Sequence, residues 1–134
     1  MPRIAELFFR TAIVFLVIGI GIGLMMAIST NHNVVGAHAH INLLGWVTSA
    51  LFGGYYALNP GKAEGRLPMA HYAIYTLGVA VMGVSLFMLL SGNPAMEPIV
   101  ALSSMITFAG VLVFAWIVFA PARQGIAPRP MAAE

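Results

Sequence analysis

The sequence predicts an all-α integral membrane protein whose four transmembrane helices pack as a bundle. Of its 134 residues, 60% are hydrophobic and only 7% are charged, a composition outside the range of soluble globular domains. A helix needs about 20 apolar residues to cross the hydrocarbon core of a bilayer. Clusters of Gly, Pro and Asn divide the chain into four runs of about that length. We therefore expect one transmembrane domain over residues 1–134, with no separate soluble domain.

The four helices are delimited by residues that end or begin them. A short amphipathic lead precedes the first apolar run, and this run is longer than the roughly 7–15 apolar residues of a signal peptide. The tripeptide Asn59-Pro60-Gly61 ends the second helix, and residues 91–94 (Ser-Gly-Asn-Pro) end the third. Pro98 suits the first turn of the fourth helix. The expected helices are residues 11–29, 34–58, 69–90 and 98–120.

The basic residues predict the orientation of the chain in the membrane. All of them lie on one side of the four-helix arrangement, and the two loops on the other side contain no Lys or Arg. The positive-inside rule then places both termini in the cytoplasm, in the inner (cytoplasmic) membrane of the cell. Because these residues are scattered among helix ends, we expect no nucleic-acid partner. The six basic residues are Arg3, Arg10, Lys62, Arg66, Arg123 and Arg129.

His38 and His40, near the start of the second helix, are the candidate metal and cofactor ligands. Ionisable residues inside membrane helices are costly and commonly mark a functional site. Residues two apart are about 200° apart around an α-helix, so the two rings cannot bind one metal from the same chain. Each ring then has its own ligand or polar contact, or His38 of one chain meets His40 of a neighbour in a homo-oligomer. The alternative is that both are interfacial residues that only hydrogen-bond to their surroundings.

His38 and His40 lie at the start of two different faces of this helix. Below His40 the surface is an ordinary apolar one. Below His38, small residues form a strip against which a flat macrocycle or another helix could lie, and Asn42 is placed to orient the His38 ring. Trp46 is too deep for an interfacial aromatic belt, so we expect it in the core or against a ligand. The candidate cofactor-binding residues are His38, His40, Asn42, Gly45, Trp46 and Ser49. Of these, Asn42, Gly45 and Ser49 belong to the strip below His38, which continues to Gly53.

The other candidate ligands have simpler explanations. His32 lies in a polar loop and His71 begins the third helix, where it is expected to anchor the chain at the interface. Met25 and Met26 lie at the depth of His38, so a Met/His heme or copper site is a minority alternative. The chain has no cysteine, which excludes thiolate-bound metals, iron–sulfur clusters and covalent heme attachment.

The second helix resembles the H-x-H helix of heme–copper oxidase subunit I. The resemblance rests on Ala37-His38-Ala39-His40, followed by Leu43, Gly45 and residues 53–55 (Gly-Gly-Tyr). In that family the two histidines bind the irons of different hemes. Subunit I also has twelve helices in three four-helix arcs, so this chain has the size of one arc. The resemblance implies a symmetric homo-oligomer, with a trimer favoured, in which His38 of one chain faces His40 of the next across a heme.

The resemblance implies a membrane b-type cytochrome that binds heme b non-covalently and serves electron transfer or O2/NO binding. Copper in that family is held by an adjacent His-His pair and a further His. This chain has no His-His pair, so we predict neither oxidase activity nor a catalytic residue. The expected partners are membrane lipid, other copies of the chain and a redox partner. The alternatives are a copper- or zinc-binding membrane protein using His32, His38 and methionines, or a non-catalytic small subunit of a respiratory complex.

Overall fold

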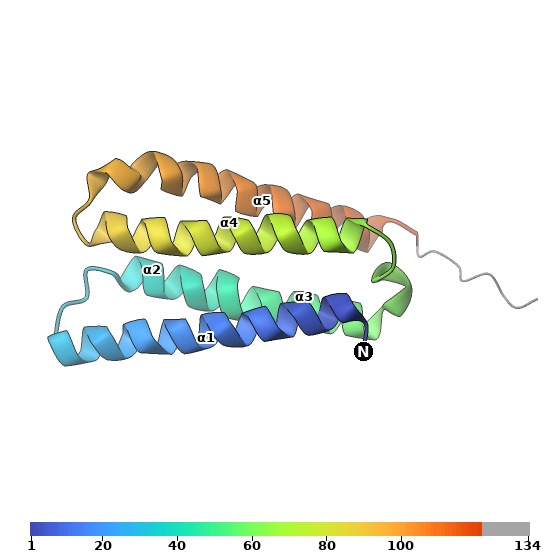
Figure 1. Cartoon of the computed structure of the whole chain (residues 1–134), viewed down its shortest axis with the longest axis horizontal. Coiled ribbons are helices and arrows are strands. Elements are labelled where there is room, and N and C mark those ends of the chain that lie inside the picture. The colour runs from blue at the N-terminus through green and yellow to red at the C-terminus, as the bar shows by residue number, and fades with distance from the viewer. Residues whose placement is uncertain (122–134) are drawn as a thin grey trace, which may run out of the picture.

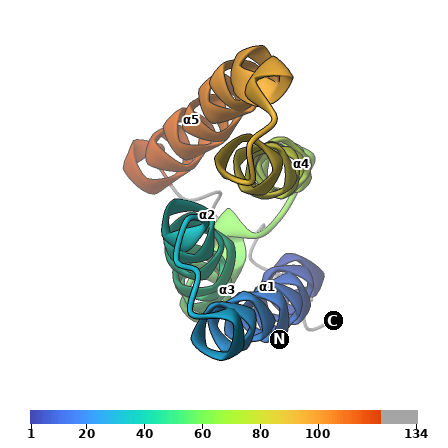
Figure 2. The same cartoon turned by 90° about the vertical axis from the view of Figure 1, so that its left-hand side faces the viewer.

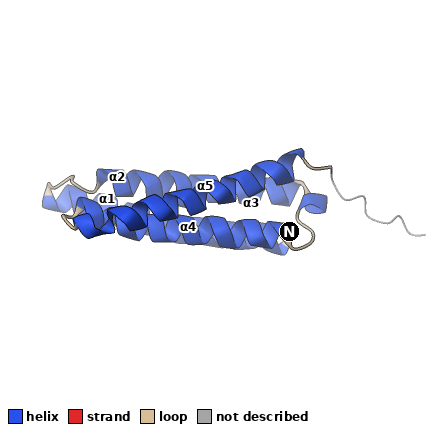
Figure 3. Cartoon of the chain, turned by 90° about the horizontal axis from the view of Figure 1, so that it is seen from above, coloured by secondary structure: helices blue, strands red, loops and turns tan. Residues whose placement is uncertain are grey.

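The computed structural model describes residues 1–121, which form four antiparallel helical rods joined by short loops (Figure 1). This range contains helices, turns and loops but no strand, so the all-α prediction is confirmed (Figure 3). Arg123 and Arg129, two of the residues used for the orientation, lie outside it. The elements are α1 (Arg3–Ser29), α2 (Val35–His40), the π-helix η1 (Ile41–Thr48), α3 (Ser49–Leu58), the 3-10 turn η2 (Pro60–Lys62), α4 (Leu67–Leu90), the 3-10 turn η3 (Pro94–Met96) and α5 (Glu97–Phe119).

Three of the helices are long and apolar enough to cross a membrane. They comprise Arg3–Ser29, Leu67–Leu90 and Pro94–Phe119, with mean hydropathies of 2.6, 2.2 and 2.2. Only 22 to 33% of the residues in their most apolar windows are buried, so most of their apolar side chains face outwards, as lipid-exposed helices require. The chain therefore has the helices of a multi-pass membrane protein. The second rod runs from Val35 to Leu58 without interruption and matches α4 in length.

The first helix begins earlier than expected, because the amphipathic lead is its first two turns. Helix α1 starts at Arg3 and buries Ile4, Ala5 and Phe8. Glu6 and Arg10 form an ion pair one turn apart on the more exposed side of the same segment. The charges lower the hydropathy of residues 1–10 without interrupting the helical pattern. The expected starts of the third and fourth helices differ from the observed ones by two residues or fewer.

Viewed along their axes, the four rods form a zigzag row in the order α1, second rod, α4 and α5 (Figure 2). Helix α1 packs on the second rod, the second rod packs on α4, and α4 packs on α5. Helices α1 and α5 lie at the two ends of this row. Glycines allow the closest approach between α4 and α5: a methyl group added at Gly78 would lie 2.7 Å from the backbone nitrogen of Thr107, and one at Gly110 would lie 2.9 Å from Cα of Tyr75.

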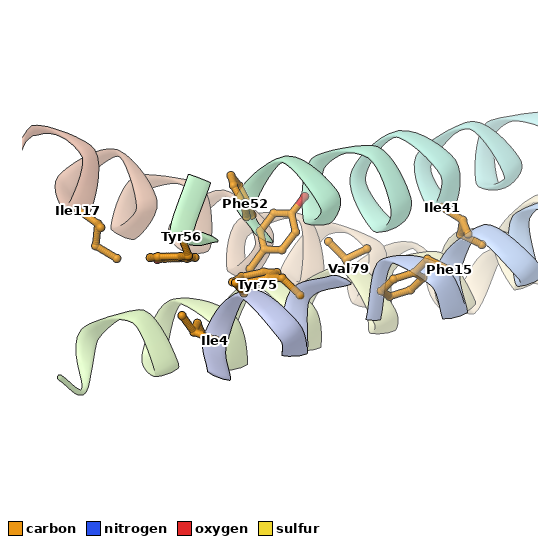
Figure 4. Packing of buried hydrophobic residues seen from close by; sticks show 10 residues of the cluster. Ile4, Phe15, Ile41, Phe52, Tyr56, Tyr75, Val79 and Ile117 are labelled. Atoms are coloured by element: carbon orange, nitrogen blue, oxygen red, sulfur yellow. The ribbon is translucent and has the colours of Figure 1, made fainter. Parts of the chain in front are cut away.

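A cluster of aromatic side chains fills the core where α1, α3, α4 and α5 meet (Figure 4). Phe52 packs against Phe114 of α5 with 4.2 Å between ring centroids, and Tyr56 and Tyr75 are completely buried beside it. At the same end, Lys62 Nζ donates hydrogen bonds to the carbonyls of Ile117 (2.8 Å), Val118 (3.2 Å) and Ala120. The carbonyl groups in the last turn of a helix have no N–H donor within the helix, and the Lys62 ammonium group serves as their donor here.

Candidate functional site

His38 lies in the seam between α1 and α2. Its Nδ1 is 2.9 Å from the carbonyl oxygen of Gly19 in the middle of α1. A carbonyl only accepts hydrogen bonds, so Nδ1 carries the proton and the neutral ring keeps an unprotonated Nε2. Gly23 makes room for the ring, because a methyl group there would lie 3.0 Å from Cε1 of His38. The bare backbone of α1 thus fixes both the position and the tautomer of this imidazole.

Asn42 contacts the same part of α1 but holds the backbone rather than the ring. Its Nδ2 donates to the carbonyl oxygen of His38 (2.9 Å), and its side chain lies against Gly19. Asn42 Nδ2 also lies 3.4 Å from Nδ1 of His38. Both nitrogens are donors when Nδ1 donates to the carbonyl of Gly19, so no hydrogen bond forms between them. The orienting role expected for Asn42 is therefore filled by the carbonyl of Gly19. Gly19 is not among the residues expected at this site, because it lies on another helix and no local sequence pattern links it to His38.

His40 is exposed, and its ring is also held by a carbonyl. Its Nδ1 donates to the carbonyl oxygen of Gly36, one turn earlier in α2, at 2.8 Å. The same argument leaves Nε2 of His40 unprotonated. Around it the second rod exposes apolar side chains, with Leu43 60% and Leu51 67% accessible and Trp46 at 36%. His38 and His40 therefore lie on different faces, one against α1 and the other on an open apolar surface.

The small-residue strip below His38 is covered by α1. Gly45 faces the Phe15 ring, where a methyl group would lie 2.6 Å from Cγ, and Gly53 faces the carbonyl oxygen of Ala5. Ser49 is buried, and its Oγ has no hydrogen-bond partner among residues 1–121. Of the two occupants considered for this strip, a helix fills it in the described structure. Asn42 and Gly45 thus both contact α1, whereas the Trp46 side chain is 36% exposed.

A π-helix follows His40 directly, and sequence reasoning did not predict it. Such segments are rare and frequently occur at functional sites. Two hydroxyls bond carbonyls within η1: Tyr75 Oη of α4 donates to Leu44 O (2.9 Å), and Thr48 Oγ1 donates to Leu43 O (2.8 Å). Because Tyr75 is distant in sequence, no local pattern could reveal this support. The π-helix sets the rotation of the two histidines relative to α3.

The remaining candidate ligands are dispersed. His32 is exposed in the loop after α1, and of the two methionines Met26 is buried and Met25 is exposed. His71 is completely buried at the other end of the molecule, so the prediction that it anchors the interface is wrong; the aromatic rings that enclose it come from three other segments of the chain. Within the described range, no group of three or more His, Asp or Glu side chains is arranged to hold a metal ion.

Comparison with known proteins gives no relative. No protein-family model matches this chain, and neither does any curated protein or solved structure.

Replacing Gly23 with alanine is expected to displace the His38 ring from its hydrogen bond with Gly19. The added methyl would lie 3.0 Å from Cε1, and the loss of a neutral hydrogen bond typically costs about 1 kcal/mol. In NMR spectra of the wild-type protein, a slowly exchanging imidazole Nδ1–H signal should be assignable to His38. It should disappear in Gly23→Ala and persist in Gly21→Ala, because a methyl group at Gly21 would have no atom within 4 Å beyond the adjacent residues and backbone of its own helix. An unchanged signal in Gly23→Ala would contradict the described seam.

Proposed function

We propose that this protein is a membrane b-type heme protein in which His38 and His40 each supply an axial imidazole. The observation that carries the proposal is the pair of hydrogen bonds from Nδ1 to the carbonyls of Gly19 and Gly36, at 2.9 and 2.8 Å. Metal-binding histidines commonly use one ring nitrogen in this way, which fixes the tautomer and orientation and leaves the other nitrogen for the metal. Heme would supply a one-electron redox centre or, with one open position, a site for a diatomic gas.

The two rings fit this role to different degrees. The His40 ring is exposed beside apolar side chains such as Leu43 and Leu51, a surface suited to the face of a macrocycle. The His38 ring is half-buried, and α1 covers the strip below it, so a heme there would bind at the edge of the α1–α2 seam. In either position one chain supplies a single imidazole per heme.

We propose that a second copy of the chain supplies the missing half of each site. A heme on the exposed face of His40 would otherwise be bounded only by lipid. Helices α1 and α5, at the two ends of the row of helices, are placed to meet neighbouring copies (Figure 2). A trimer would place three such four-helix units in a ring, as the resemblance to heme–copper oxidase subunit I implies. His38 of one chain would then face His40 of the next.

We place the protein in the inner membrane with both termini in the cytoplasm. Arg3 and Arg10 near the start of α1 lie at the same end of the rods as Lys62 and Arg66, in the loop before α4 (Figure 1). The loops at the opposite end contain no Lys or Arg. This asymmetry supports the positive-inside assignment. Both candidate ligands then lie towards the outer face.

The deciding experiment is an absorption spectrum of the purified protein, with and without added hemin. The dithionite-reduced protein should show a Soret band and a split α-band, and the amount of bound iron should scale with the amount of protein chain. CO or NO should shift the bands only if a coordination position is open. A spectrum without a Soret band after hemin is supplied would refute the proposal. Copper or zinc in place of iron would instead favour a metal-binding protein.

A further inference from the structure

The buried pair formed by Tyr56 and His71 lies at the end of the molecule opposite the candidate heme ligands. We propose that this pair is a redox-active site, in which one-electron oxidation of Tyr56 moves its phenolic proton to Nδ1 of His71. This inference is independent of heme binding by His38 and His40. It rests on the hydrogen bond between the two side chains, on their burial and on the rings that surround His71.

The geometry connects a phenol directly to a base. Tyr56 Oη is 2.9 Å from Nδ1 of His71, and both side chains have no accessible surface. The phenol has one proton, and no other partner for it occurs within residues 1–121. If Tyr56 donates, Nδ1 accepts and the only unpaired group is the Nε2–H of His71; the reverse direction would leave both the phenolic proton and Nε2 unpaired. The arrangement with fewer unpaired groups is the one in which His71 can take the proton.

Three aromatic rings surround His71. Phe8, Phe52 and Phe114 surround it with centroid distances of 5.0, 4.7 and 5.2 Å. Aromatic faces attract a cation within about 6 Å of the ring centroid, and the interaction is strongest where water is excluded. These rings can also accept the otherwise unpaired Nε2–H as a weak hydrogen bond. Contact with these aromatic rings therefore offsets part of the cost of burying an imidazolium at this position.

The step is balanced by a one-electron oxidant from outside the pair, of the class of high-potential metal complexes. The phenolic O–H bond breaks, the electron passes to the oxidant, and a new N–H bond forms at Nδ1 of His71. The products are a neutral tyrosyl radical at Tyr56 and an imidazolium at His71. Return of one electron to Tyr56 and of the proton from Nδ1 restores the starting state.

Tyr75 provides an internal control. It is also completely buried, and its ring lies in the same aromatic cluster, 4.9 Å from that of Phe52. Its hydroxyl, however, donates to the backbone carbonyl of Leu44 at 2.9 Å. A carbonyl oxygen is not a base that can take this proton. The two tyrosines therefore differ chiefly in the acceptor of the hydrogen bond, and only Tyr56 is expected to form a long-lived neutral radical.

The test is flash photo-oxidation of the full chain in lipid nanodiscs with photogenerated tris(bipyridine)ruthenium(III), followed by transient absorption and EPR. The wild-type protein and Tyr75→Phe should give a long-lived neutral tyrosyl radical, and Tyr56→Phe should not. In His71→Gln, whose amide keeps a polar partner but is not a base, the lifetime should fall by about tenfold or more, the order that one charge-assisted hydrogen bond supplies.

A second variant covers the case in which Tyr56→Phe does not fold. Placing 3-fluorotyrosine at position 56 keeps the hydroxyl and should add fluorine hyperfine splitting to the EPR signal. The proposal is overturned if that splitting is missing, if Tyr56→Phe keeps the radical, or if the lifetime in His71→Gln equals that of the wild-type protein.

Discussion

Heme should be lost when either His38 or His40 is replaced by alanine, and it should be retained when His32 is replaced. Loss of residues that merely orient a metal ligand typically costs 10- to 100-fold in affinity, so loss of a ligand should lower heme affinity by at least about 100-fold. His32 is the matched control because its ring is exposed in a loop at the same end of the molecule. Heme content per chain, measured from the reduced spectrum after hemin reconstitution, gives the comparison.

Added imidazole should distinguish the two ligand variants. His40 is exposed, so removing its ring leaves an open position that free imidazole can reach, and the spectrum of His40→Ala should recover. The His38 ring lies against Gly23 and is held by Gly19, and free imidazole has no covalent link to keep it in that narrow seam. Recovery in His38→Ala should therefore be weaker. Full heme retention in both alanine variants would refute the ligand assignment.

The helical framework could be predicted from the sequence because its determinants are local. Apolar runs gave the number of rods, and Pro and Gly gave their ends: Asn59-Pro60-Gly61 closes α3, and Pro98 lies in the first turn of α5. The start of α1 was missed because hydropathy reports how well a segment fits into lipid, and it does not report whether a helix continues into a more polar segment. Burial of Ile4 and Phe8 against other helices is what continues α1 back to Arg3, and this contact is invisible in a window average.

The candidate site was only partly predictable because most of its contacts join distant segments. The spacing of His38 and His40 was enough to predict separate faces. It could not reveal that Gly19 holds one ring, that Tyr75 supports a π-helix after His40, or that α1 covers Gly45. His71 was misplaced for the same reason, since its depth depends on rings from α1, α3 and α5. Hydropathy places a residue along a helix but says little about which neighbour encloses it.

Gly78→Ala is expected to be the most destabilising of the small substitutions in the chain. The added methyl would lie 2.7 Å from the backbone nitrogen of Thr107 and 3.0 Å from its Cα. Backbone atoms cannot rotate away as a side chain can, so α4 and α5 must separate. Overpacking typically costs about 1–3 kcal/mol, and we expect the free energy of unfolding to fall by about 3 kcal/mol. Steric-trapping measurements in bicelles would give this value.

Gly21→Ala is the matched control, because the added methyl would have no atom within 4 Å beyond the adjacent residues and backbone of its own helix, and alanine is the better helix former. Since α5 packs mainly on α4, its displacement should leave the seam between α1 and α2 unchanged. Gly78→Ala should therefore lose stability while the hydrogen bond from His38 to Gly19 persists. If Gly78→Ala proved as stable as Gly21→Ala, the close approach of α4 and α5 would be wrong. If the His38 signal were lost together with the stability, the α1–second rod pair and the α4–α5 pair would fold as one unit.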